Sequence, residues 1–174
     1  GSTVAVEVDH GGADVVAFDV LLGDRTGFAK VPLAVAMIDM LEQIGIGGVQ
    51  QEVEAAVASC SAETLEALEF ARNRIAEHHK RQVPESGRYT DALGVELGHR
   101  WTAVESVGLY VPGGLASYPS SVLMNAVPAK VAGVRDVLVC SPPTTSGQPS
   151  DVVLAAAELA GADRVFAIGG AGAI

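Results

Sequence analysis

Beyond residue 106 the chain alternates between short, continuously apolar runs and longer segments whose apolar residues recur every three to four positions. Apolar runs cover 107–111, 136–140 and 164–168, and the segments 119–132 and 150–160 lie between them. A proline or a glycine follows each apolar run within two residues. Continuous apolar strands separated by helices predict a parallel sheet with right-handed crossovers. We therefore expect a β-α-β-α-β unit here.

Before residue 105 the apolar positions mainly follow the period of helices. The clearest segment follows Ser61, whose side chain can cap a helix, and carries Lys80 and Arg81 at its negative end before Pro84 stops it. Helices are accordingly predicted in four segments: 15–22 after the cap Asp14, 31–44, 49–58 and 61–81.

Residues 88–105 change to a two-residue period. Val95, Leu97 and Trp101 fall on one side of this segment, and Gly94 offers a turn before them. Alternation around a glycine turn predicts a β-hairpin.

Together these patterns predict an α/β protein with two parts. Residues 1–105 are expected to be the mainly helical part of a larger α/β domain, and residues 106–174 a partial Rossmann-like nucleotide-binding domain. The third strand of that unit is followed by no helix before Ile174. We therefore expect one bare sheet face and a truncated chain.

The composition and net charge limit the classes of partner that the chain could bind. The 21 acidic residues against 11 Lys and Arg give a net charge of −10, which argues against binding nucleic acid or an anionic membrane. Hydrophobic residues make up 49% and charged residues 18%, so either more chain or a partner covers the surface, or the fold is simply rich in alanine and valine. Cys60 and Cys140 lack metal-ligand spacing and are expected to be buried thiols in a reducing compartment. A cytoplasmic location follows from these expectations.

Candidate chemistry gathers where the first strand of the unit ends. Pro112, Gly113 and Gly114 form a turn in which the missing Cβ atoms would let a pyrophosphate or an adenosine approach, although a tight turn alone also favours glycine. Tyr110 ends the strand at the carboxyl edge, where open α/β sheets bind ligands. It could stack on a ring, or it could be a rim tyrosine without a ligand.

A second glycine loop follows the last strand. Gly170 and Gly172 begin a G-x-G-x-x-G pattern whose third glycine would be residue 175, so this signal is weak. The four histidines show no metal-binding spacing, and neither a catalytic residue nor a metal ligand is assigned in this chain.

Three motifs resemble histidinol dehydrogenase: Arg88-Tyr-Thr-Asp-Ala-Leu-Gly-Val-Glu-Leu-Gly98, Val107-Gly-Leu-Tyr-Val-Pro-Gly-Gly114, and the run from Tyr118 to Gly133. The resemblance extends over residues 50 to 174. It implies a zinc-containing homodimer that oxidises L-histidinol to L-histidine through an aldehyde, with two molecules of NAD. It also implies that Tyr110 is the family tyrosine that contacts NAD.

Two departures from the family pattern limit this implication. Gly172 stands where the family has an NAD-contacting glutamine, and the family's Glu-His catalytic pair and zinc ligands match no position before Ile174. One interpretation is an amino-terminal portion of the enzyme that is inactive alone. The alternative is a non-catalytic binding or assembly module derived from that fold. The expected partners are a small-molecule cofactor and either a second copy or the missing carboxyl-terminal half.

Overall fold

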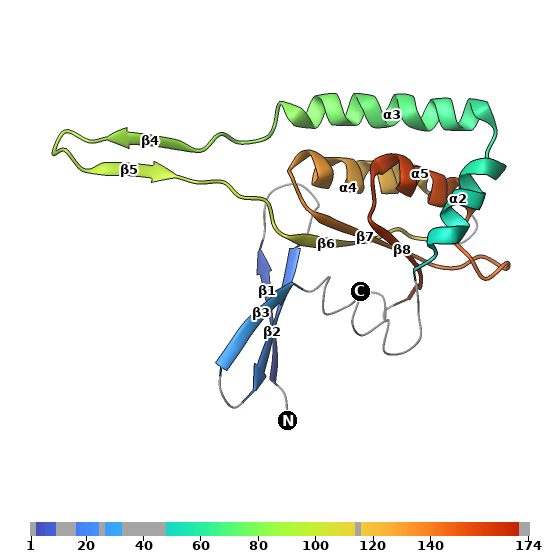
Figure 1. The fold of residues 1–174 in the computed structure, drawn as a ribbon, viewed down its shortest axis with the longest axis horizontal. Coiled ribbons are helices and arrows are strands. Elements are labelled where there is room, and N and C mark those ends of the chain that lie inside the picture. The colour runs from blue at the N-terminus through green and yellow to red at the C-terminus, as the bar shows by residue number, and fades with distance from the viewer. Residues whose placement is uncertain (1–2, 10–16, 25–26, 33–47, 114–115, 171–174) are drawn as a thin grey trace.

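The computed structural model describes residues 3–9, 17–24, 27–32, 48–113 and 116–170 (Figure 1). Its carboxyl half is a three-stranded parallel sheet in the order β6-β7-β8, with one helix after each of the first two strands. The elements are β6 (Ser106–Tyr110), α4 (Pro119–Val131), β7 (Asp136–Ser141), α5 (Asp151–Ala160) and β8 (Arg164–Ala167). The predicted β-α-β-α-β unit is confirmed, with each boundary within one residue.

One face of this sheet packs on α4 and α5. Alternate strand residues, such as Val107, Val137 and Val165, join the apolar sides of both helices in one buried core. Since α4 and α5 both cross over from the end of one strand to the start of its neighbour, they lie on the same side of the sheet. The carboxyl ends of all three strands meet at one edge.

The opposite face of the sheet is buried along the central strand β7 and at Phe166 of β8, which corrects the expectation of a bare face. Leu138, Cys140 and Phe166 alternate with the residues of the helix-covered core, and at most 1% of each is exposed. On this side, strand β2 (Ala17–Asp24) contacts β6. Cys140 is thus buried as predicted, whereas Cys60 is only partly buried; both are free thiols.

Two further helices, both predicted from the sequence, form a second layer in the structure. In Figure 1 the long helix α3 (Ala62–Lys80) runs along the outer side of α4 and α5, and α2 (Gln50–Ser59) packs against α5. The backbone N–H of Thr64 donates to Ser61 Oγ at 3.2 Å, which confirms Ser61 as the amino-terminal cap of α3. Val49 N–H donates to the carbonyl of Val165 at 3.0 Å and so fastens the start of α2 to β8.

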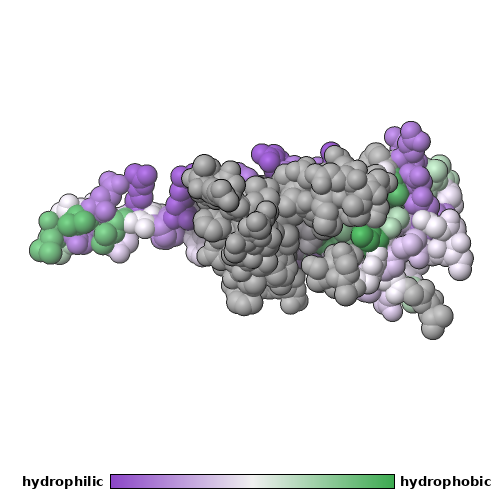
Figure 2. All heavy atoms as spheres, turned by 90° about the horizontal axis from the view of Figure 1, so that it is seen from below, coloured by the Kyte–Doolittle hydropathy of each residue, from purple (hydrophilic) through white to green (hydrophobic). Residues whose placement is uncertain are grey.

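The predicted hairpin is confirmed as β4 (Gly87–Thr90) and β5 (Glu96–His99), an antiparallel pair that projects away from the body of the molecule (Figure 1). Tyr89 pairs with Leu97, so these apolar residues share one face, while the Arg88–Glu96 ion pair lies on the other. Figure 2 shows apolar side chains gathered at the far end of this arm, where Leu93 is 89% exposed.

The amino-terminal residues correct the helical prediction. Strands β1 (Thr3–Asp9), β2 (Ala17–Asp24) and β3 (Gly27–Pro32) form an antiparallel sheet in that order. The helix predicted for 15–22 is therefore wrong over β2, and the start of the 31–44 helix falls in β3. The aromatic and β-branched residues of these short segments suit extended backbone better than a helix. The rest of 31–44 lies outside the described residues.

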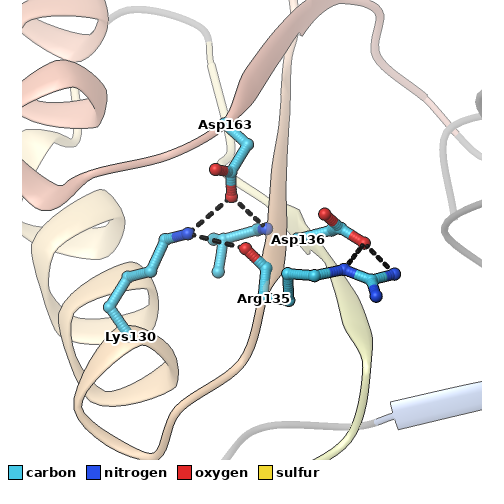
Figure 3. A network of polar contacts seen from close by, with 5 residues as sticks. Lys130, Arg135, Asp136 and Asp163 are labelled. Carbon is cyan, nitrogen blue, oxygen red and sulfur yellow. Dashed lines mark hydrogen bonds and ion pairs between the residues drawn. The ribbon is translucent and has the colours of Figure 1, made fainter.

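A polar network ties the amino edge of the parallel sheet together (Figure 3). The Asp163 carboxylate accepts hydrogen bonds from Lys130 Nζ at 2.6 Å and from the Val137 backbone N–H at 2.7 Å. Lys130 Nζ also donates to the carbonyl of Arg135, whose guanidinium pairs with Asp136. This network connects the end of α4 to β7 and to the start of β8, at the edge opposite the glycine loops.

Candidate functional site

A pocket of about 230 Å³ opens at the carboxyl edge of the parallel sheet. It lies between the loop that follows β6 and the loop that follows β7, and residues at the start of α5 also line it. Its lining comprises Pro112, Gly113, Ala116 and Ser117 from the first loop, Ser141 to Thr145 from the second, and Ser150 and Val153 around the start of α5.

The pocket wall combines hydroxyl groups with proline rings. Ser117, Thr145 and Ser150 contribute hydroxyls, and Ser150 precedes α5 without making a side-chain capping bond. None of the described residues in the lining is charged. The positive end of the α5 backbone dipole faces the same region, so the pocket favours neutral polar groups and anions.

Hydrogen bonds hold the second loop in place. The Thr144 N–H donates to the Gln148 carbonyl at 2.7 Å, and the Gly147 N–H donates back to the Thr144 carbonyl at 3.0 Å. Gln148 Nε2 reaches Glu52 of α2 at 3.5 Å, and Ser59 Oγ donates to the Asp151 carboxylate at 2.7 Å. The α2 helix therefore supports both the loop and the first turn of α5.

Two glycines approach the same proline from either side. A Cβ atom added to Gly113 would lie 3.1 Å from Pro142 Cβ, and one added to Gly169 would lie 2.6 Å from Pro142 Cγ. Real Cβ atoms essentially never come within 3.0 Å of a neighbouring heavy atom. The end of β7 is thus packed closely between the loops that follow β6 and β8.

The structure separates the residues that the sequence singled out. Pro112 and Gly113 line the pocket. Tyr110 does not: it pairs with Cys140 on the sheet face opposite α4 and α5, where it is partly buried. Gly170 is exposed and lies outside the lining. Gly114 and Gly172 lie outside the described residues.

Sequence reasoning missed the hydroxyl residues of the pocket. Ser117 and Ser150 flank predicted helices, and Thr144 and Thr145 follow two prolines, so each looked like ordinary loop sequence. The available signal was the position of both loops after parallel strands, since those loops must meet at one edge.

Beneath this edge, burial raises the pKa of the Cys140 thiol to about 11, because desolvation disfavours the thiolate. Cys140 therefore stays protonated and acts as a small apolar side chain. Among the described residues, no group of three His, Cys, Asp or Glu side chains could hold a metal ion. No helix in the described part of the chain is long and apolar enough to span a bilayer.

The parallel strands, the crossover helices and the glycine-proline pocket at the carboxyl edge define a Rossmann-like α/β unit, the class of fold that binds nucleotides at this edge. The family model for histidinol dehydrogenase matches residues 34–174. The chain therefore belongs to the histidinol dehydrogenase family.

Individual relatives agree with this assignment. Histidinol dehydrogenase of Brucella abortus (strain 2308) is 59% identical over 134 residues, which are 77% of this chain and 31% of the relative. That of Bradyrhizobium diazoefficiens is 53% identical over 152 residues, 86% of this chain and 35% of the relative. The crystal structure of histidinol dehydrogenase from Elizabethkingia anophelis superposes with a TM-score of 0.68 at 30% identity, covering 78% of this chain and 33% of that one. The chain spans about a third of the length of the curated relatives it matches.

Proposed function

We propose that this chain is the nucleotide-side, amino-terminal portion of a histidinol dehydrogenase, the NAD-dependent enzyme that oxidises L-histidinol to L-histidine. The pocket at the carboxyl edge of β6 and β7 carries this proposal. Its lining includes Pro112 and Gly113 of the family-like motif and residues at the start of α5. We further propose that residues 106–174 form the partial nucleotide-binding domain, residues 1–105 belong to the other domain, and the protein acts in the cytoplasm.

The lining fits part of a dinucleotide. A volume of about 230 Å³ is below the roughly 300–1,000 Å³ typical of pockets for drug-sized ligands, so it suits one ribose or phosphate portion. NAD, when bound, would supply the hydride acceptor. A cofactor that continues across the sheet edge would meet Tyr110 on the opposite face. Gly172 offers no side-chain amide, which removes one contact that the family resemblance implies.

Zinc does not fit the described residues, because no cluster of suitable ligands exists among them. With NAD, zinc and histidinol supplied together, the 174-residue chain alone is expected to produce no NADH. Turnover at the rate of an intact relative would contradict this part of the proposal.

The binding test is a calorimetric titration with NAD. We expect weak binding, near 1 mM, which corresponds to about −4 kcal/mol. Thr145 is exposed and lines the pocket, so Thr145→Phe should fill it and weaken binding at least about tenfold, a loss of roughly 1.4 kcal/mol. Thr102→Phe places the same side chain on an exposed residue outside the lining and should leave the affinity unchanged. Equal effects of the two substitutions would refute this site.

One observation favours the second function, a non-catalytic assembly module. The hairpin β4-β5 exposes Tyr89, Leu93 and Leu97, and an isolated two-stranded hairpin is only marginally stable in water. We propose that a second copy, or the remaining part of a histidinol dehydrogenase, covers this face. Light scattering combined with the NAD titration separates the functions: a monodisperse oligomer with no heat of NAD binding favours assembly, and a monomer that binds NAD favours the enzyme portion.

A further inference from the structure

A side chain at Gly169 is excluded by a collision with Pro142, and not by the backbone conformation of the residue. The described glycines with positive φ include Gly161 and Gly170 but neither Gly113 nor Gly169. A residue with a side chain could therefore adopt the backbone angles at both positions. What excludes a side chain at Gly169 is Pro142, whose Cγ, Cβ and Cα atoms would lie 2.6, 2.7 and 3.1 Å from the added Cβ.

The topology fixes the direction in which this contact acts. β7 is the central strand, so Pro142 at its end lies between the loop after β6 and the loop after β8. A Cβ on Gly169 would press Pro142 towards Gly113. Pro142 and Gly113 both line the pocket, whereas Gly169 does not.

We propose that Gly169 is a positioning residue that sets the width of the pocket from outside its wall, through Pro142. The Gly113–Pro142–Gly169 contact would couple the loop after β8 to the space between the other two loops. Only the expected consequence, weaker nucleotide binding, rests on the proposed function. The movement of Pro142 itself needs no ligand.

The first test is the crystal structure of the Gly169→Ala chain. We expect Pro142 to be displaced towards Gly113 and the pocket to be smaller than about 230 Å³. An unmoved Pro142 with an unchanged pocket would overturn the proposal. This measurement decides the proposal even if the unsubstituted chain binds no NAD, in which case the proposed function alone fails.

The second test measures NAD affinity in a double-mutant cycle. Gly169→Ala should weaken binding at least about tenfold, as expected when a fitted wall moves into a pocket. Pro142→Gly removes the Cβ and Cγ atoms, so in this background Gly169→Ala should change the affinity by less than about threefold. Pro142→Ala keeps the Cβ at 2.7 Å and should not rescue. Equal rescue by both Pro142 variants would contradict the steric argument.

Gly161→Ala is the matched control. Gly161 follows α5 at φ 78°, and the nearest atom to an added Cβ is 3.9 Å away on Lys130. The substitution strains the backbone and should lower the melting temperature, but it does not touch Pro142. NAD affinity should therefore remain unchanged. A loss of affinity equal to that of Gly169→Ala would show that general destabilisation explains both variants.

Discussion

Replacing Asp163 tests whether the network at the amino edge holds the sheet to α4. The carboxylate accepts from Lys130 Nζ at 2.6 Å and from the N–H of Val137, a fully buried residue, at 2.7 Å. In Asp163→Ala this N–H loses its acceptor, which costs about 1–3 kcal/mol. The Lys130 pair is partly exposed, at 28% and 44%, so solvent screening limits it to roughly 0.5–1 kcal/mol. The expected loss is the sum of these two costs, about 1.5–4 kcal/mol.

Thermal unfolding followed by circular dichroism measures this loss. A domain of this size loses roughly 2–4 °C of melting temperature per kcal/mol, so Asp163→Ala should melt about 3–16 °C lower. Asp163→Asn keeps an acceptor for the Val137 N–H and should lose about half as much. Glu77→Ala breaks an ion pair whose partners are 61% and 74% exposed, and it should change the stability by less than about 0.5 kcal/mol. A melting temperature for Asp163→Ala equal to that of Glu77→Ala would refute the assigned role.

Three further predictions concern the two thiols and the β4-β5 hairpin. Burial raises the pKa of Cys140 from 9.0 to about 11, because desolvation disfavours the thiolate. The stability that the buried thiol contributes is therefore present below pH 9 and is lost as the pH rises through 11. The unfolding midpoints of the unsubstituted chain and of Cys140→Ala should converge between pH 9 and 11. In the native chain a thiol reagent should modify Cys60 first, and simultaneous modification of both would contradict the burial of Cys140. Leu93→Ser with Leu97→Thr should reduce self-association in sedimentation velocity, while Thr90→Ser on the opposite face should not; unchanged association in the double variant would argue against the arm as a contact surface.

Local signals carried the sequence prediction where they agreed with one another. Ser61 before a periodic segment and Pro84 after it predicted α3, because capping and proline geometry act within a few residues. The prediction failed over β2, where a short apolar segment suits both a helix and a strand. Pairing with β1 and β3 decides between them, and a single-sequence period does not contain that pairing.

Part of the candidate site could be predicted from the sequence, namely the glycine turn but not the hydroxyl residues. The turn at Pro112 and Gly113 was found because a glycine turn after a parallel strand has a known place at the carboxyl edge. The side of the sheet on which Tyr110 lies follows from strand alternation, but its separation from the pocket depends on where the α5 helix packs. Thr145 and Ser150 could not be predicted as site residues, because their place in the pocket depends on the loop after β7 lying beside the loop after β6.

By itself, the sequence determined the order of strands and helices beyond residue 106, the hairpin, the cap of α3 and the resemblance to a family. These features depend on residues close in the chain, whose spacing and turn chemistry act locally. Only the tertiary structure decided that both faces of the central strand β7 are buried and that a pocket lies between two loops. It alone showed that Gly169 touches Pro142. Such features arise from contacts between segments distant in sequence, whose distances depend on how the whole sheet and its helices pack.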